Sequence, residues 1–337
     1  MRLHVILLLL FVLLPATSVL GEENNQGDQF TFIVYLDNDG GVVKPNNDTD
    51  RYYTNGLKLT ASHQPAWGQR LADRITSVIP LGDGITQSAV GYVVAQEIYT
   101  PAHVERKAFQ PLDRPYAGWL YGGIFLQRQA GEVFDHFELN IGVVGPSSAA
   151  EDAQNWIHEL FGTEDAEGWS HQLPDELGVD FIYRRKWRIT LVNGDGSSLK
   201  AQLIPQAGIT VGNVNRYIEG GATLRIGCHL PDDFGPGRLH DVASTTVRQD
   251  QQEFNGYLFV GAGGRYVEHN MFLEGSNYTD SHSVDEESWV GQAMLGVVIN
   301  WRSFAVSYSQ VFVTREFAGQ NGTHSYGSIL VSFRKEF

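Results

Sequence analysis

Apolar and polar residues alternate along most of this chain. Apolar residues recur at every second position in runs such as 32–36 and 137–143, and the residues between them are polar or small. Since successive side chains of a strand point to opposite faces, this pattern predicts strands with one apolar face. Twelve such segments occur, at residues 32–36, 53–61, 92–98, 117–125, 137–143, 181–192, 199–203, 222–226, 257–259, 295–301, 304–308 and 329–337.

A two-sheet sandwich alternates in the same way, so the pattern leaves two architectures open. Two further features favour a membrane barrel. Aromatic residues gather near the strand ends, and the chain finishes on an alternating strand whose last residue is Phe337. Both are typical of bacterial outer-membrane barrels. We therefore predict an all-β fold: a twelve-stranded antiparallel transmembrane β-barrel of the bacterial outer membrane.

The lengths of the connections sort them onto two sides. An even number of strands places both termini on one side, expected to be the periplasm. The breaks on that side are short (129–133, 193–198 and 301–303), and those on the outer side are long (37–51, 99–115 and 145–180). Two periplasmic connections are exceptions. The first, residues 64–88, contains the helix-like WGQRLADRITSVI, and the second, residues 229–253, is polar and predicts no element.

The amino-terminal residues and the composition limit the class of protein. Residues 1–21 have a basic start, an apolar run and small residues, which predicts a secretory signal peptide ahead of a single barrel domain at 22–337. The apolar run is too short to cross a membrane as a helix. Cys228 is the only cysteine, so no intrachain disulfide can form. The net charge of −15 argues against nucleic acid as a partner.

The segment Pro146–Phe161 interrupts the alternation and predicts a helix in an outer loop. Ser148 followed by Glu151 forms a capping-box pattern, and Gly162 supplies a stop. Gln154 and His158 are four residues apart and share one face. Histidine is the commonest general base near neutral pH, so His158 is a candidate catalytic residue. The alternative is a surface helix whose histidine has no role.

Two further polar clusters fall on the same outer rim. The first contains Asp37, Asn38 and Asp39, then residues 48–51 and Thr54. Its oxygen atoms suit Ca²⁺, although such residues also form turns, and an acidic outer loop also suits the divalent ions that bridge lipopolysaccharide. Strand parity points Thr54 and Lys58 into the lumen.

The second of these clusters is residues 113–116, which includes Arg114. Arg114 suits either a lumenal salt bridge or a phosphate, and Lys58 suits the same roles less well. No nucleophile elbow, HExxH motif or phosphate loop is present. If the chain is a hydrolase, attack by water is therefore favoured over a covalent acyl-enzyme.

Four motifs in order carry a resemblance to a known family. DNDGG…TDRYYTNGLKLT, QEIYTP, DRPYAGWLY and GVVGPSSAAEDAQNWIHEL together resemble the lipid A 3′-O-deacylase family. The resemblance implies a twelve-stranded outer-membrane barrel. It also implies Ca²⁺-dependent hydrolysis of the ester that holds the 3′ acyloxyacyl group of lipid A. The expected partners are lipopolysaccharide, outer-membrane lipid and the barrel-assembly machinery, and the expected state is a monomer.

The family's site residues transfer to named positions of this chain. The resemblance matches its adjacent Asn and Asp to Asn38 and Asp39, its helix histidine to His158, and a polar residue one turn earlier to Gln154. Its strand hydroxyl matches Thr54, with Thr60 or Ser62 as alternatives. Its basic residue matches Arg114 or Lys58, which would bind a lipid A phosphate, and Asp39 with Asp37 would bind the metal.

The implied mechanism has His158 activate a water that attacks the ester carbonyl, while Ca²⁺ stabilises the oxyanion and Thr54 positions the water. Two rivals remain at this point. One is an outer-membrane phospholipase, for which no convincing serine nucleophile is present. The other is a small pore or adhesin, although the narrow lumen is expected to be filled by side chains such as Glu138, Arg334 and Glu336.

Overall fold

A computed structural model of the chain describes residues 29–39, 52–82, 84–161, 165–194, 199–241, 243–245 and 254–336. The leader, most of the acidic loop at 40–51, Gly162 and Phe337 lie outside these ranges, so the predictions made for them stay predictions.

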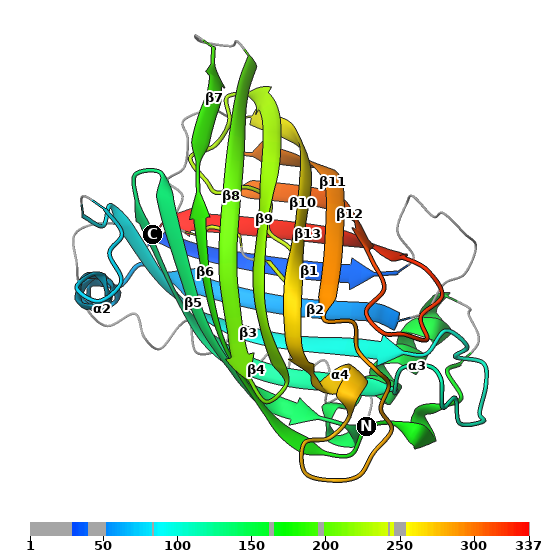
Figure 1. The fold of residues 1–337 in the computed structure, drawn as a ribbon. Coiled ribbons are helices and arrows are strands. Elements are labelled where there is room, and N and C mark those ends of the chain that lie inside the picture. Colours follow the sequence, from blue (N-terminus) through cyan, green and yellow to red (C-terminus); the bar gives the residue numbers. More distant parts are fainter. Residues whose placement is uncertain are drawn as a thin grey trace.

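The described strands form one antiparallel sheet that closes on itself (Figure 1). β1 pairs with β13, and β6 pairs with β8. The strands are β1 Gln29–Asn38, β2 Tyr52–His63, β3 Gln87–Thr100, β4 Ala117–Ala130, β5 Val133–Val144, β6 Glu176–Trp187, β7 Ile189–Asn193, β8 Leu199–Gly212, β9 Asn215–Cys228, β10 Phe254–Asn270, β11 Trp289–Trp301, β12 Phe304–Val313 and β13 His324–Glu336.

The segments β6 and β7 are two parts of one barrel strand. They are separated only by Arg188, and they pair with successive stretches of β8, residues 206–212 and 200–203. The backbone N–H of Arg188 instead donates to the carbonyl of Glu132 in the β4–β5 turn, at 2.9 Å. The barrel formed by the described residues therefore has twelve strands, which confirms the prediction.

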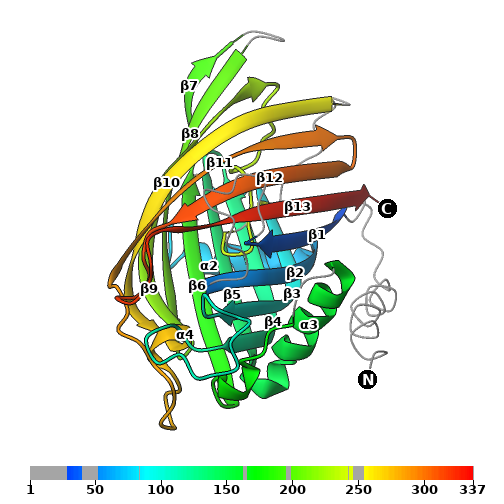
Figure 2. The ribbon, with the colours of Figure 1, turned by 90° about the vertical axis from the view of Figure 1, so that its right-hand side faces the viewer.

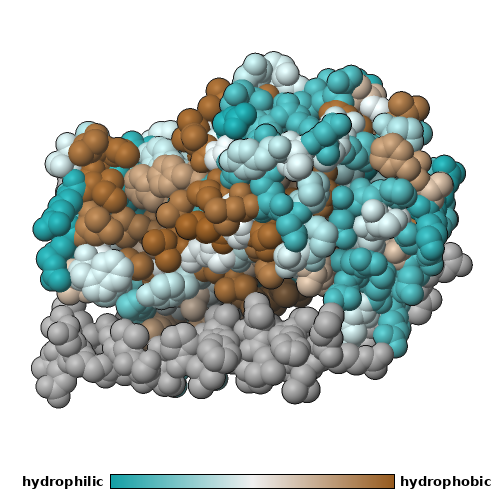
Figure 3. Space-filling model, turned by 90° about the horizontal axis from the view of Figure 1, so that it is seen from below, coloured by the Kyte–Doolittle hydropathy of each residue, from teal (hydrophilic) through white to brown (hydrophobic). Residues whose placement is uncertain are grey.

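The two faces of each strand differ as the alternation predicts. On β1, Thr31, Ile33 and Tyr35 are buried in the lumen, and Leu36 is 44% exposed on the outer wall. Apolar side chains continue around the outer wall and form a belt that Figure 3 shows in brown, bordered by a hydrophilic end. The belt includes Leu36, Tyr92, Ile124, Leu139, Ile141, Phe181, Leu224, Leu258, Leu295, Ile299, Val306 and Ile329.

The helix predicted in the first long periplasmic connection is confirmed. It is α2, Ala66–Thr76, and its Ala72 packs with Val90 and Leu126. These two residues alternate with Gly91 and Phe125, which face the lumen, so α2 lies outside the wall. In the described residues no helix is long and apolar enough to cross a membrane.

The second long connection that is predicted to be periplasmic, between β9 and β10, folds back into the lumen. We call its described residues, 229–241 and 243–245, the lumen plug. Asp241 of the plug pairs with Lys186 at 2.9 Å, and the backbone N–H of Thr245 donates to Gln127 at 2.8 Å. Phe234 stacks on Phe134 with ring centroids 5.3 Å apart. The sequence pattern does not predict this plug.

The outer β5–β6 connection contains the predicted helix with a later start. A short 3₁₀ turn, η2 Pro146–Ser148, precedes α3 Ala150–Phe161. Ala149 between them has a left-handed φ of 54°. The hydroxyl of Ser148 donates to the carbonyl of Gly145 at 2.6 Å, so Ser148 closes the turn and is not the N-cap of α3. Two short helices complete the outer loops, η3 Trp169–His171 and α4 Met271–Glu274.

Candidate functional site

Helix α3 lies on the outside of the barrel, against β3 and β4 (Figure 2). Gln96 and Gly118 alternate with Glu97 and Trp119, which line the lumen, so they face outward. The amide of Gln96 donates to the carbonyl of Ser148 at 2.7 Å. A Cβ added at Gly118 would lie 2.2 Å from the Cβ of Ala150. A glycine on the outer face of β4 therefore allows α3 to sit directly on the wall.

An apolar cluster fixes α3 to this wall. Ile98 faces outward from β3, yet it is only 1% exposed, because it is covered by Tyr116, Ala150, Ala166 and Trp169. The rings of Tyr116 and Trp169 have centroids 5.0 Å apart. Burial raises the pKa of the Tyr116 phenol to about 12, so it stays neutral and its hydroxyl donates to the carbonyl of Val104.

The helix face predicted to carry the chemistry is buried. The side-chain carbonyl of Gln154 accepts a hydrogen bond from the indole N–H of Trp169 at 2.9 Å. His158, one turn further along, is 4% exposed. A histidine on a helix that merely covers the surface would be largely open to solvent. The burial of His158 therefore argues against the surface-helix alternative.

The predicted strand residues meet at one corner of the wall, where β1, β2 and β3 end. The backbone N–H of Asp39 donates to the carbonyl of Thr54 at 3.2 Å. The hydroxyls of Thr54 and Thr100 are 2.6 Å apart and hydrogen-bonded. Asn38 is exposed and faces outward, opposite to Asp37. Asn38, Asp39, Thr54 and Thr100 thus form what we call the strand corner.

The position of Thr54 corrects the parity prediction. The pairing of β2 with β3 is irregular between Tyr53 and Asn55, as in a β-bulge. Tyr53 lines the lumenal pocket, whereas the hydroxyl of Thr54 meets Thr100, which follows the lumen-lining Tyr99. Thr54 therefore takes the wall side. An inserted residue reverses the alternation, which simple counting along the strand cannot detect.

The two alternatives to Thr54 are in a different place. Thr60 and Ser62 are 7% and 3% exposed, and they have the same strand parity as the lumenal Lys58. They also lie farther along β2, away from the end that carries the strand corner. Of the three hydroxyl residues, Thr54 is the one beside Asn38 and Asp39.

Asp37 is not part of the strand corner. Its side chain is 1% exposed in the lumen and accepts a hydrogen bond from the hydroxyl of Tyr53 at 3.2 Å. Since Asn38 points the opposite way, a metal site that combined both residues would need ligands from both faces of β1. We therefore remove Asp37 from the predicted ligands.

Lys58 faces the lumen as predicted, but it does not reach the outer wall. Its ammonium contacts Glu138 at 2.9 Å, and both side chains are almost fully buried. Glu138 also contacts His136 at 3.0 Å and accepts from Asn140 at 2.8 Å. The prediction that Lys58 binds a substrate phosphate is therefore not supported, because its charge is used inside the barrel.

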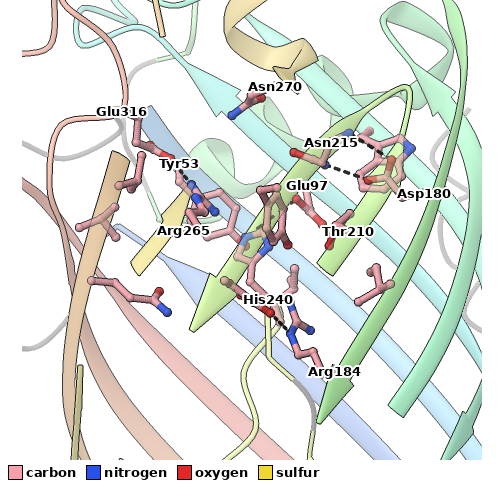
Figure 4. Close-up of a pocket in the computed structure, with 18 of the residues that line it drawn as sticks. Tyr53, Glu97, Asp180, Arg184, Thr210, Asn215, His240, Arg265, Asn270 and Glu316 are labelled. Atoms are coloured by element: carbon pink, nitrogen blue, oxygen red, sulfur yellow. Dashed lines mark hydrogen bonds and ion pairs between the residues drawn. The ribbon is translucent and has the colours of Figure 1, made fainter. Parts of the chain in front are cut away.

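Arg114 also points inward, at the outer mouth of the lumen. Its guanidinium stacks 4.6 Å from the ring centroid of Tyr99 and lies 3.6 Å from Glu316. Burial lowers the pKa of Arg114, and the charge of Glu316 partly offsets this. Glu316 in turn pairs with Arg265 at 2.6 Å (Figure 4). This favours the lumenal salt bridge over the phosphate ligand for Arg114.

The strand corner suits a hard cation by the chemistry of its donors. The amide oxygen of Asn38, the carboxylate of Asp39 and the hydroxyls of Thr54 and Thr100 are oxygen ligands of the kind that Ca²⁺ prefers. Within the described ranges, no three His, Cys, Asp or Glu side chains cluster as a metal site. The oxygen ligands of the strand corner fit a calcium site better than a zinc site, for which nitrogen and sulfur ligands are typical.

Two residues of this region are not assigned by the sequence argument. Thr100 falls within the motif QEIYTP but receives no role from it, and Trp169 lies outside all four motifs. Thr100 is 46 residues from Thr54 and Trp169 is 15 from Gln154. Pairing of β2 with β3 in the correct register would have pointed to Thr100, whereas no local signal identifies Trp169.

A scan against family models matches residues 4–335 to a family described as outer membrane protein LpxR. A search of curated proteins returned no match. Among solved structures, LpxR from Salmonella typhimurium matches with a TM-score of 0.73 and 23% sequence identity, covering 90% of this chain and 99% of that chain.

More distant barrels also match. The β domain of the Bordetella autotransporter BrkA has a TM-score of 0.42 and 10% identity, covering 93% of this chain and 100% of its own. The translocator domain of NalP from Neisseria meningitidis has a TM-score of 0.37 and 11% identity, covering 97% and 95%. These two carry no argument about function.

Proposed function

This chain belongs to the LpxR family of outer-membrane proteins, and we propose that it is a lipid A 3′-O-deacylase whose site lies on the outer wall of the barrel. Membership supports an outer-membrane enzyme that removes acyl chains from lipid A. The position of the ester and the mechanism are our proposal. The observation that supports them best is the buried His158 on a helix held against the wall, beside the strands that carry the corner.

The location of the site suits a lipid substrate. Acyl chains of lipid A would lie along the apolar belt, next to side chains such as Leu36, which is one residue from Asp37 and two from Asn38 on β1. The sugar and its ester linkages would then lie at the level of the strand ends, where the strand corner and α3 are. A lumenal site would require the lipid to leave the membrane, which costs about 0.8 kcal/mol for each CH₂ moved into water.

His158 acts as the general base in this proposal. Its imidazole takes a proton from a water, and the water oxygen attacks the ester carbonyl to give a tetrahedral intermediate. When the intermediate collapses, the bond between the former carbonyl carbon and the 3′ oxygen of the sugar breaks, and the imidazolium returns the proton to the leaving 3′ alkoxide. The products are a carboxylic acid and the free 3′ hydroxyl. The Thr54 hydroxyl, bonded to Thr100, orients the water or the ester.

Gln154 has a positioning role. Its bond to Trp169 ties α3 to the cluster over Ile98, which holds His158 at a constant height above the wall. Asn38 and Asp39 would hold Ca²⁺ with their side-chain oxygens. When bound, the ion supplies positive charge that stabilises the developing oxyanion.

The first test is mass spectrometry of lipid A from cells that express the wild type or His158→Ala. We expect the wild type to remove one acyloxyacyl unit and His158→Ala to be slower by about two or more orders of magnitude, as for a lost general base. His103→Ala is the matched control, since His103 is an exposed outer-loop histidine. Equal removal by both variants would exclude His158 as the base, and cleavage of glycerophospholipid would indicate the phospholipase instead.

The metal proposal has a separate test. We expect chelation by EDTA to abolish deacylation and added Ca²⁺ to restore it. In Asp39→Ala the Ca²⁺ concentration needed for half-maximal activity should rise at least tenfold, because a charged oxygen ligand is lost. Asp37→Asn should leave that concentration within about twofold. Full activity in EDTA would refute the calcium site.

A further inference from the structure

The tip of the lumen plug lies directly behind the strand corner. We define the plug tip as Arg238, Leu239 and His240, each of which lines the lumen or packs inside it. The plug enters from the periplasmic end, where β9 stops and β10 starts. Its tip nevertheless reaches Tyr53, the residue next to Thr54 near the outer end of β2. The plug therefore extends through most of the barrel.

Leu239 fills the space behind the ends of β1 and β2. It packs with Ile33, Tyr35 and Leu330 in one buried cluster. A Cβ added at Gly56, the strand partner of Asp37, would lie 2.6 Å from the side chain of Leu239. This close approach is possible only because position 56 is a glycine. The two strands and the plug tip are thus in van der Waals contact one layer below Asn38 and Thr54.

His240 of the plug tip also contacts Tyr53, which is the residue before Thr54 of the strand corner. The two rings have centroids 4.9 Å apart, and His240 also lies 3.9 Å from Glu97 on β3 (Figure 4). The hydroxyl of Tyr53 donates to Asp37. Asp37 and Tyr53 are the immediate neighbours of Asn38 and Thr54. Any displacement of the tip would be transmitted through one peptide unit to each corner residue.

We propose that the plug tip is a positioning element for the outer-wall site, holding the ends of β1 and β2 at the spacing that the strand corner needs. This rests on the proposed function for its effect on catalysis. Backbone pairing holds the ends of β1 and β2 together in the plane of the wall as far as Asn38 and Asn55, and their lumen side is supported by packing of side chains. The tip supplies this support by filling the lumen behind them.

The test compares Leu239→Ala with Leu239→Met and with Thr245→Val. Leu239→Ala opens a void behind the strand corner, whereas Leu239→Met keeps the side-chain volume. Thr245→Val removes a hydrogen bond between the plug and Gln127 of the wall, outside the plug tip. We expect kcat to fall about tenfold in Leu239→Ala with KM within twofold, and both controls to stay within twofold of wild type. Mobility on unheated SDS gels shows that each barrel is folded.

A spin label provides a readout that does not need activity. In a Cys228→Ser background, a nitroxide at Leu36→Cys on the outer face of β1 should become more mobile in Leu239→Ala. One at Ile299→Cys on β11 should not change. Unchanged mobility at position 36, or an equal loss of kcat in Leu239→Ala and Thr245→Val, would overturn the proposal. If the wild type does not deacylate lipid A, the proposed function fails and the label alone decides the role of the tip.

Discussion

At the residue scale, adjacent polar residues of one strand have different environments, because one side chain points into the lumen and the next points to the outer wall. Asp37 is buried behind Tyr53, while Asn38 faces the outer wall. Lys58 is paired with Glu138 inside the barrel, and its ammonium is buried on the lumen side of β2. Residue type and motif position alone would make all three candidates for the outer-wall site. The chemistry that each can perform depends on the face of the strand it occupies.

The buried pair of Lys58 and Glu138 gives a prediction at this scale. Lys58→Met leaves the Glu138 carboxylate without its cation, and we expect the barrel to lose about 3–5 kcal/mol of unfolding free energy, measured by urea titration in detergent. KM for lipid A should not change. Lys58→Met with Glu138→Gln should recover most of the stability. A large rise in KM without a loss of stability would return Lys58 to the substrate site.

At the scale of elements, the position of α3 depends on its packing against β3 and β4. The sequence of the helix shows its amphipathic pattern, but the surface that it packs against is formed by Gly118, Ile98 and Gln96 on β3 and β4. The sequence between 146 and 150 bends through η2 and a left-handed Ala149 before the helix starts. The position of His158 is therefore determined by the fit of a helix to a barrel wall.

Gly118→Val tests whether close packing of α3 on the outer face of β4 is needed for activity. The added side chain would collide with Ala150 and Ser148, so α3 should move away from the wall and deacylation should fall at least tenfold while the barrel stays folded. Gly122→Val is the matched control. Gly122 faces outward on the same strand, and a Cβ there meets only a backbone oxygen at 3.7 Å. Equal activity in the two variants would show that α3 need not contact this position.

At the scale of the whole molecule, the candidate site lies on the outer wall and buried side chains occupy the lumen. The lumen holds the plug and buried ion pairs such as Arg265 with Glu316 and Lys186 with Asp241. The prediction that Glu138 is among the side chains that fill the lumen is confirmed, whereas the side chain of Glu336 lies outside the described residues, so its part of the prediction stays a prediction. The strands are therefore packed against side chains on their lumen side and do not surround a column of water.

A filled lumen predicts that the protein does not conduct ions. In a planar lipid bilayer the wild type should show no steady single-channel openings, because the plug occupies the path between the two ends. A variant in which residues 232–250 are replaced by a short glycine-rich turn should conduct. Steady openings of the wild type would instead support the passive-pore alternative.

The sequence by itself determined the features that depend on local periodicity. The twelve strands, their order, the helix-containing outer loop and the helix at 66–76 all follow from patterns within about a dozen residues, and the structure confirms them. Motif resemblance pointed to Asn38, Asp39, Thr54 and His158. The structure brings the first three to one corner and buries the fourth on α3, which packs against β3 and β4.

The tertiary structure alone decided the features that join distant parts of the chain. Lys58 and Glu138 are 80 residues apart in the sequence, and no local pattern predicts their ion pair. The same is true of the plug, whose polar residues resemble an ordinary loop until the lumen surrounds them, and of the bulge that turns Thr54 to the wall. Closure of the sheet separates a lumen from an outer wall. Polar side chains from strands that are distant in the sequence then face one another across the lumen and can pair.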